Sequence, residues 1–282
     1  MKLASYIADG KPAFGLVTDM GVITLSDRMG PRSYTLREAL QEDGALDEML
    51  NLARGAEPDR RLEQIKFLPV ITDPGKILCV GINYRSHAAE HGHAVLEKPN
   101  IFTKFTDCLT AHEGEMIRPK ASTQLDFEGE LVVIIGKAGR AIPAQHALSH
   151  VAGYTCFCDG SVRDFIKISL ITGKNFPATS PLGPWMVTAD EIPDPSKLTL
   201  TTRLNGTQMQ HSGTDMMMHD VPALIAYCST FTALSPGDII ATGTPEGIGA
   251  RRNPPVWMKA GDVLEVEISK IGTLRARVAD ER

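Results

Sequence analysis

Acidic side chains alternate with apolar or small ones in the segment LDFEGELVVIIG, residues 125–136. Side chains two apart in a strand share a face, so Asp126, Glu128 and Glu130 are predicted to crowd together on one side. Residues 131–135 then form an unbroken apolar run, which is typical of a strand buried on both faces. Carboxylates in such a place repel each other and lose hydration, and a divalent cation removes both penalties. A solvated strand end is the competing interpretation, and the spacing alone does not separate the two.

A second acidic position favours the cation. Residues 153–165, GYTCFCDGSVRDF, are predicted to form a short strand that leads into Asp159, with Gly160 and Arg163 close behind it. No His or Cys lies at ligand spacing near these acids, so the ligand set is made of oxygen alone. Such a set favours Mg²⁺ or Mn²⁺ over zinc. The acids of these two segments are therefore predicted to be metal ligands.

These segments belong to a chain of 282 residues whose first part reads as short strands and one helical region. Three β-rich runs are predicted at residues 2–9, 11–19 and 21–27, followed by a helical pattern that is interrupted near Gly44. A Pro-containing segment comes next. We place a domain boundary near residue 70, giving a small α/β N-terminal domain (residues 1–70) and a catalytic domain (residues 71–282). The alternative is one domain in which the first hairpins join the same sheet.

Two later patterns are clear. Residues 263–280 alternate apolar and charged side chains around a Gly-containing turn, which predicts a hairpin with Glu and Arg facing each other on its wet side. Asp220 suits a helix N-cap and Pro222 suits the first turn of that helix. Its buried stripe is predicted to contain Val221, Leu224, Ile225, Cys228 and Phe231. The predicted class is α+β and mainly β, with a few helices covering a curled sheet.

The composition excludes several classes of function. The formal net charge is -5 and there is no basic stripe, so nucleic acid is not expected as a partner. No stretch reaches the ~18–20 apolar residues of a membrane span, and the first residues lack the apolar run of a signal peptide. The five cysteines are scattered and odd in number, which favours reduced thiols. We expect a soluble cytoplasmic protein.

From about residue 75 to the C-terminus, the order and spacing of several segments resemble the fumarylacetoacetate hydrolase family. The segments are ILCVGINYRSHAAEHG, EKPNIFTKF, LDFEGELVVIIGK, DGSVRDF, GKNFPATSPLGPWMVT, LNGTQMQ and LSPGDIIATGTPEGIG. The resemblance implies a mixed β-sandwich roll, a Mg²⁺ or Mn²⁺ ion and a homodimer. The first seventy residues resemble the variable N-terminal domain of bacterial members.

By position, the resemblance implies that Glu128, Glu130 and Asp159 are the metal ligands. Asp126 matches an acid that stands beside the ligands and supports the strand. His87 and Glu90 match a dyad in which the glutamate orients a histidine that activates water, and a spacing of three residues places both on one face of a helical turn. Without the resemblance, His87 would be interpreted as a surface histidine.

Three further roles rest on the resemblance alone. Lys174 matches a lysine that stabilises negative charge developing on the substrate, and Arg163 matches a substrate-binding arginine. Thr244 lies in the Gly-rich segment ATGTPEGIG and matches a residue near the substrate, where backbone N–H groups can approach an anion. A tight turn without a ligand is the alternative for that segment. Residues 87–98, rich in His, Gly and charge, are predicted to be a lid that orders on substrate binding.

The chain departs from the family pattern within CDGSVRDFI, where many members have NDxSARDxQ. Cys158 stands in place of the usual Asn, and Ile166 stands in place of a Gln that helps to hold substrate in relatives. A different or more apolar arrangement of the substrate is therefore expected.

Together these features predict hydrolytic cleavage of a C–C bond in a small acylpyruvate-type 1,3-dicarbonyl acid. The 2-oxo and carboxylate (or enolate) oxygens of the substrate would chelate the cation, water activated by His87 would attack the distal carbonyl, and the leaving carbanion would be delocalised as an enolate. The same apparatus suits a 2-oxo acid decarboxylase of the oxaloacetate type or an enol–keto isomerase. A non-catalytic protein that binds small acids or metal is the remaining alternative.

Overall fold

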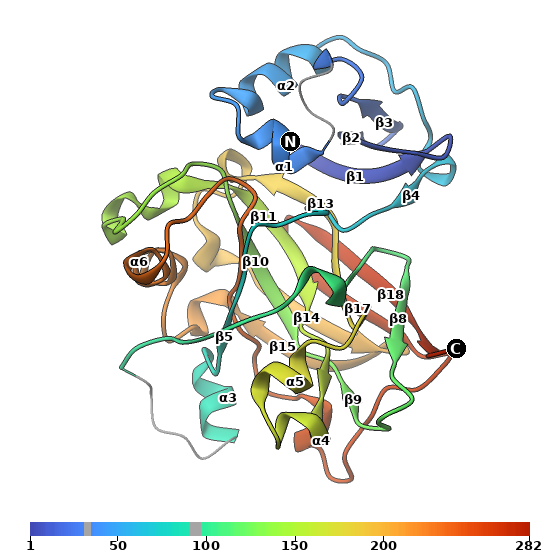
Figure 1. Ribbon diagram of the computed structural model, residues 1–282, viewed down its shortest axis with the longest axis vertical. Coiled ribbons are helices and arrows are strands. Elements are labelled where there is room, and N and C mark those ends of the chain that lie inside the picture. The colour runs from blue at the N-terminus through green and yellow to red at the C-terminus, as the bar shows by residue number, and fades with distance from the viewer. Residues whose placement is uncertain (31–34, 91–96) are drawn as a thin grey trace.

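The computed structural model describes residues 1–30, 35–90 and 97–282. Within these residues the largest sheet has 11 strands, with the main order β3-β2-β1-β13-β11-β10-β16-β5-β6, β4 paired with β1 and β7 paired with β13. A five-stranded sheet, β15-β14-β17-β18-β8, packs against it, and β12 and β9 form a two-stranded sheet. The predicted α+β, mainly β class is confirmed (Figure 1).

The strands are β1 (Lys2–Ala8), β2 (Lys11–Thr18), β3 (Gly21–Thr24), β4 (Lys66–Phe67), β5 (Ile77–Gly81), β6 (Asn100–Thr103), β7 (Leu109–Thr110), β8 (Glu115–Arg118), β9 (Leu125–Asp126), β10 (Gly129–Ile135), β11 (Val151–Cys158), β12 (Ser161–Val162), β13 (Ser180–Thr188), β14 (Thr199–Leu204), β15 (Thr207–Gly213), β16 (Ile239–Ala241), β17 (Val263–Ile268) and β18 (Gly272–Asp280). The α-helices are α1 (Leu36–Leu40), α2 (Ala45–Ala53), α3 (Arg85–Glu90), α4 (Arg163–Ile166), α5 (Leu170–Lys174) and α6 (Val221–Phe231).

Strand β10 explains why residues 131–135 are apolar without interruption. Leu131, Val133 and Ile135 belong to the core that is shared with the five-stranded sheet. Val132 and Ile134 point the other way, into a second core that includes residues of α1 and α2. All five side chains are fully buried, so the predicted burial of this strand on both faces is confirmed.

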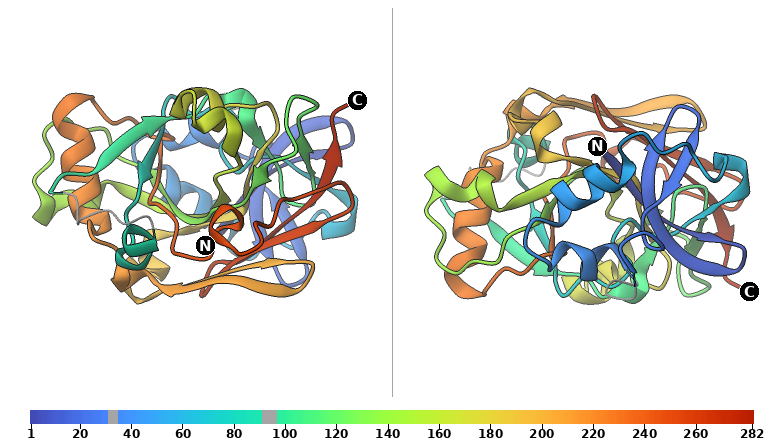
Figure 2. Two further views of the ribbon diagram at one scale, coloured as in Figure 1. Left: turned by 90° about the horizontal axis from the view of Figure 1, so that it is seen from below. Right: turned by 90° about the horizontal axis from the view of Figure 1, so that it is seen from above.

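The N-terminal segment continues the large sheet. Lys2 on β1 lies opposite Val187 on β13, and Leu3 lies opposite Met186. Helices α1 and α2 cover that end of the sheet, as both the front view and the view from above show (Figures 1 and 2). The break in the helical pattern is confirmed at Gly44, whose φ of 75° is a left-handed conformation that glycine adopts without strain. The domain boundary near residue 70 stays a prediction.

The two later patterns are also present, with one correction. Glu265 on β17 lies directly opposite Arg275 on β18, and the side chain of Asp220 caps α6 by accepting a bond from the Ala223 N–H at 2.9 Å. Phe231 was predicted to be buried in the stripe of α6, and this prediction is wrong: its exposed fraction is 53%. Phe231 is the last residue of the helix, and its ring lies edge-on to Tyr227.

The continuous strand predicted through the acidic residues is wrong as well. The chain leaves one strand after Asp126 and enters the next at Gly129, because β9 pairs with β12 whereas β10 pairs with β11. The acids are therefore not arranged by a single pleat. Helices α3, α4 and α5 surround this region, at the end of the molecule opposite the N-terminal helices (Figure 1). In the described residues no helix is long and apolar enough to cross a membrane.

Candidate metal centre and active site

Three carboxylates meet at the ends of two paired strands. Glu128, Glu130 and Asp159 each offer an oxygen atom, and these oxygens all lie within 4.8 Å of one another. The pairing of β10 with β11 places Gly129 opposite Cys158, and the Asp159 N–H donates to the Glu128 carbonyl oxygen at 2.8 Å. The strand register thus brings together the three predicted ligands, and all three side chains are buried.

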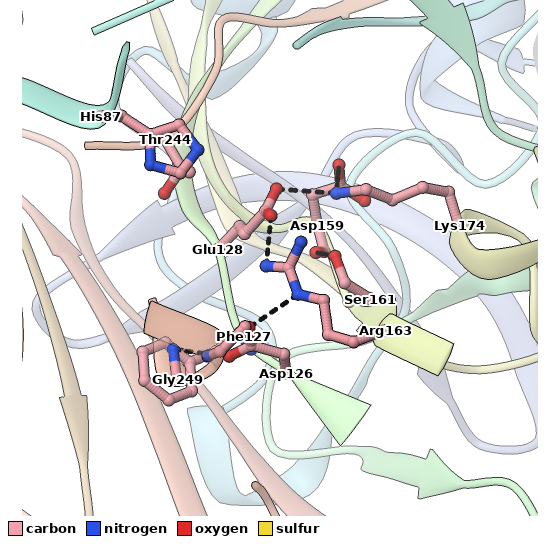
Figure 3. A network of polar contacts seen from close by, with 12 residues as sticks. His87, Asp126, Phe127, Glu128, Asp159, Ser161, Arg163, Lys174, Thr244 and Gly249 are labelled. Atoms are coloured by element: carbon pink, nitrogen blue, oxygen red, sulfur yellow. Dashed lines mark hydrogen bonds and ion pairs between the residues drawn. The ribbon is translucent and has the colours of Figure 1, made fainter. Parts of the chain in front are cut away.

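Two cationic side chains hold Glu128 (Figure 3). The Lys174 ammonium, at the end of α5, donates to Glu128 Oε2 at 2.7 Å and to Asp159 Oδ2 at 2.6 Å. The Arg163 guanidinium, at the start of α4, donates to Glu128 Oε1 at 2.5 Å and to Asp126 Oδ2 at 2.7 Å. Asp126 is therefore linked to the triad through Arg163, in agreement with its position beside the ligands.

Lys104 was not singled out by the sequence, although it lies in the quoted segment EKPNIFTKF. Its fully buried ammonium donates to Asp159 Oδ1 at 2.7 Å, to the Gly160 carbonyl and to the Lys174 carbonyl. It therefore ties one oxygen of Asp159 to the end of the helix that carries Lys174. A lysine followed by an aromatic residue has no distinctive spacing, so only the tertiary contacts reveal this role.

The charges of this cluster fit a hard divalent cation. Within the described residues four carboxylates (Asp126, Glu128, Glu130 and Asp159) contact or adjoin three cationic side chains (Lys104, Arg163 and Lys174), which leaves one buried negative charge in excess. The ligand set is oxygen only, as Mg²⁺ and Mn²⁺ prefer. Lys174, placed between Glu128 and Asp159, shows directly that the triad accepts positive charge.

The pKa directions follow from this arrangement. Burial would raise the pKa of Glu128, but the charges of Lys174 and Arg163 outweigh it and hold that pKa well below its usual value. Burial, followed by the charges of Asp159 and Glu128, raises the pKa of Glu130 well above its usual value. The excess negative charge of the cluster therefore makes the ionised form of Glu130 the least favourable of these carboxylates.

The Gly-rich segment 241–249 binds the site's own acids. The Gly243 N–H donates to Glu130 Oε2 at 2.9 Å, the Gly247 N–H to Glu90 Oε1 at 3.3 Å, and the Gly249 N–H to Asp126 Oδ1 at 2.7 Å. Gly247 has a φ of 95°, and a Cβ there would lie 2.3 Å from the Met209 carbonyl oxygen. Backbone N–H groups were predicted to approach an anion, and the anions they meet here are protein carboxylates.

Thr244 lines the pocket, but its hydroxyl is already engaged. It donates to the Gly129 carbonyl at 2.9 Å and accepts from the Gln210 amide at 2.8 Å. Gln210 also accepts from the Gly129 N–H at 3.0 Å. Thr244 therefore fixes the start of β10 beside Glu128 and Glu130.

His87 and Glu90 form the predicted dyad on α3. His87 Nδ1 lies 3.0 Å from Glu90 Oε2, and the histidine is only 4% exposed. Burial raises the pKa of Glu90, and the Gly247 N–H opposes the shift. His87 is thus a buried residue with a fixed ring, and the interpretation as a surface histidine is excluded. Residues 91–96 of the predicted lid lie outside the described residues.

A pocket of about 170 Å³ opens over the triad and the dyad. Its lining includes every predicted site residue except Glu90 and Asp159: His87, Glu128, Glu130, Arg163, Lys174 and Thr244. Those two residues contact the lining instead, Glu90 through His87 and Asp159 through Lys174. The site joins a base, a set of oxygen ligands and two cations around one small cavity, which suits the stabilisation of an enolate or oxyanion.

Replacing Lys104 with Met is expected to weaken Mg²⁺ binding about 10–100-fold, because the residue that orients the Asp159 carboxylate is lost. It should also lower the free energy of unfolding by ~3–5 kcal/mol, the usual cost of breaking a buried ion pair, because Asp159 Oδ1 and the Gly160 and Lys174 carbonyls lose their donor while Asp159 keeps only Lys174 among its described ion-pair partners. Calorimetric titration with Mg²⁺ and urea unfolding measure the two effects. Lys120→Met, at an exposed position, is the control and should change neither. Unaltered Mg²⁺ affinity in Lys104→Met would show that Asp159 does not depend on Lys104.

Residues 76–279 match the family model of the fumarylacetoacetate (FAA) hydrolase C-terminal domain. The chain belongs to the fumarylacetoacetate hydrolase family. The human mitochondrial oxaloacetate tautomerase FAHD2B is 37% identical over 274 residues, which cover 95% of this chain and 87% of the relative. The resemblance drawn from the quoted motifs is therefore confirmed, and this family consists of enzymes that include hydrolases, isomerases and tautomerases.

Two solved structures of the family extend the comparison over the whole chain. The fumarylacetoacetate hydrolase of Exiguobacterium antarcticum has a TM-score of 0.84 and 32% identity, with 100% of both chains covered. The maleylpyruvate hydrolase of Sphingobium sp. SYK-6, in complex with manganese(II) and pyruvate, has a TM-score of 0.85 and 26% identity, again with 100% of both chains covered. A manganese ion is thus present in one structural neighbour of this family member.

Proposed function

We propose that this family member is a Mg²⁺- or Mn²⁺-dependent enzyme that interconverts the keto and enol forms of a small 2-oxo acid. The observation that carries the proposal is the His87–Glu90 dyad at 3.0 Å on a pocket that is also lined by Glu128 and Glu130. The oxaloacetate tautomerase relatives, 37% identical over 95% of this chain, support tautomerisation as the reaction. A base and a cation site facing one cavity are the two parts that enolisation needs.

A divalent cation bound by Glu128, Glu130 and Asp159 would supply positive charge that lowers the energy of the enolate. His87 takes the proton from C3 of the acid, the C2=C3 double bond forms, and the proton is returned to the 2-oxygen. Glu90 holds the ring through Nδ1, so Nε2 is the nitrogen that moves the proton. Lys174 supports the oxygen that gains charge, and Arg163 holds the carboxylate of the acid.

The test is the rate of deuterium incorporation at C3 of oxaloacetate in D₂O that contains Mg²⁺, monitored by proton NMR. We expect the protein to accelerate loss of the C3 proton signal above the rate with Mg²⁺ alone, and a chelator to abolish the acceleration. The carbon skeleton should survive the exchange. No acceleration, or an acceleration that persists in chelator-treated protein, would refute the proposal.

Hydrolytic C–C cleavage of an acylpyruvate is the second candidate. It is favoured by the same dyad, because a buried histidine oriented by a carboxylate also activates water. The structural similarity to a maleylpyruvate hydrolase supports it. With acetylpyruvate as substrate, the same NMR experiment separates the two candidates: hydrolysis gives pyruvate and acetate, whereas tautomerisation gives deuterium at C3 without fragments. With oxaloacetate as substrate, a decarboxylase would be recognised by the release of CO₂.

A further inference from the structure

The pocket has two chemically different halves. One half holds the ionic groups described above. The other half is mainly apolar and comes from four elements: Val80 on β5 with Ile82 just after it, Phe102 on β6, Ile166 on α4 and Leu170 on α5, with the exposed Asn100 at the start of β6 as a polar residue of the lining. Ile82, Phe102, Ile166 and Leu170 are only half-buried, so part of their apolar surface faces the cavity and water. Covering such surface with an apolar group is favourable.

The apolar half is held in place by its surroundings. Ile82 has a φ of 56°, a conformation that is costly for a β-branched residue and persists only where neighbours enforce it. The neighbour is Asn83, whose side chain donates to the His219 and Thr242 carbonyls at 2.9 and 2.8 Å. On the other side, helices α4 and α5 pack so closely that a Cβ on Gly173 would lie 2.2 Å from Ile166 Cγ1. Ile82 and Ile166 are thus fixed walls.

Among the described residues that line the pocket, positive charge is confined to the ionic half. Arg163 and Lys174 are the cationic side chains among the described residues that line the pocket, and each already bonds two carboxylates. The Lys174 ammonium lies 5.4 Å from the centre of the Phe102 ring, which marks the border between the halves. Because both of these described cations already have carboxylate partners, a carboxylate placed against Ile166 and Leu170 would lose hydration without gaining an unoccupied cation among the described lining residues, which is costly.

We propose that the apolar half receives an uncharged, apolar substituent, so that the preferred substrate is a 2-oxo acid with one charged head and a neutral alkyl or aryl tail. This inference rests on the proposed function, because that function places the acid head at the triad. A dicarboxylate such as oxaloacetate is then still accepted at the triad but binds less tightly than an acid with a neutral tail. A substrate with a neutral tail fits both candidate reactions.

Binding of two matched, non-enolisable acids tests the proposal. N-isobutyloxamate and N-oxalylglycine share an oxamate head and differ in carrying an isopropyl group or a carboxylate at the end of the tail. Calorimetric titration of the Mg²⁺-loaded protein is expected to show at least about tenfold tighter binding of N-isobutyloxamate. Equal affinity, or tighter binding of N-oxalylglycine, would overturn the inference.

Two lysine variants locate the effect. Ile166→Lys puts a cation on the apolar wall and should shift the affinity ratio about tenfold or more towards N-oxalylglycine. Ile168→Lys lies two residues away, where the isoleucine is 76% exposed and outside the pocket lining, and should leave the ratio unchanged. If Ile166→Lys does not fold, Leu170→Lys makes the same test. The inference is contradicted if the ratio of the two affinities changes as much in Ile168→Lys as in Ile166→Lys. It is also contradicted if the ratio does not change in Ile166→Lys.

Oxalate distinguishes a failure of this inference from a failure of the proposed function. Oxalate presents a chelating head without a tail, and it should bind the protein far more tightly with Mg²⁺ than in its absence. Mg²⁺-dependent oxalate binding together with a preference for N-oxalylglycine overturns the apolar tail alone. Oxalate binding that does not depend on Mg²⁺ overturns both the proposed binding of the acid head at the triad and the inference of an apolar tail that depends on it.

Discussion

Glu130→Gln is expected to lower the rate of C3 deuterium exchange by about 10³-fold or more, a loss of ~4 kcal/mol of transition-state stabilisation. The substitution keeps the shape of the side chain and its bond from the Gly243 N–H, but removes one of the three charged ligands. Mg²⁺ affinity should fall with it. The cation-free protein should be as stable as wild type or more stable, because Glu130 carries the excess negative charge of the cluster and has a raised pKa.

The sign of that stability effect follows from linkage. A carboxyl whose folded pKa lies above its unfolded value opposes folding when it is ionised, and this cost is present at neutral pH and disappears below the unfolded pKa. Glu128 is the opposite case, since its pKa is lowered by Lys174 and Arg163. Glu128→Gln should therefore lose Mg²⁺ binding and also lose stability, by ~3–5 kcal/mol. NMR measures the rate of C3 deuterium exchange, calorimetry measures the Mg²⁺ affinity, and urea unfolding measures the free energy of unfolding.

Glu115→Gln, on an exposed position of β8, is the matched control and should behave as wild type. Full exchange activity in Glu130→Gln would show that the triad is not the catalytic cation site. Equal destabilisation by both triad variants would contradict the assignment of the excess charge to Glu130.

His87→Asn is expected to lower the exchange rate by about 10²–10⁴-fold, the usual contribution of a positioned general base. Mg²⁺ affinity should remain within about twofold of wild type, because His87 is not one of the three ligands. Glu90→Gln should have a smaller effect of the same kind, since it disturbs the orientation of the ring and leaves the base in place. Exchange rates and calorimetric titration with Mg²⁺ separate loss of the base from loss of the cation.

His146→Asn, at an exposed position, provides the control for the histidine substitution. Retention of the exchange rate in His87→Asn would assign the proton transfer to another group. A parallel loss of Mg²⁺ binding would instead mean that His87 acts through the cation site.

The sequence predicted well the features that depend on local pattern. The helix N-cap at Asp220, the break at Gly44 and the pairing of Glu265 with Arg275 each follow from residues close together in the chain or from strict alternation. Residues 131–135 predicted a strand that is buried on both faces, because every side chain in the run is apolar. The exposure of Phe231 could not be predicted from periodicity, because it depends on where the helix ends.

The residues of the site could be predicted from the sequence, but the contacts that hold them in place could not. The triad could be named because the family resemblance assigns Glu128, Glu130 and Asp159 as ligands and sets Asp126 beside them, whereas the spacing of the acids alone left a solvated strand end as an alternative. The contacts that hold it join positions far apart in the chain, such as Gly243 with Glu130, Gly247 with Glu90 and Lys104 with Asp159. Pairwise contacts over such separations leave no spacing signal in a single sequence. The break between Asp126 and Gly129 was missed for the same reason, since two different partner strands impose it.

Crystals soaked in Mn²⁺ and measured for anomalous scattering test the central claim most directly. We expect one strong peak at about 2.1–2.2 Å from an oxygen of each of Glu128, Glu130 and Asp159, with the Lys174 ammonium moved off the line between Glu128 and Asp159. A peak elsewhere, or Lys174 still joined to both acids at saturating Mn²⁺, would contradict that claim.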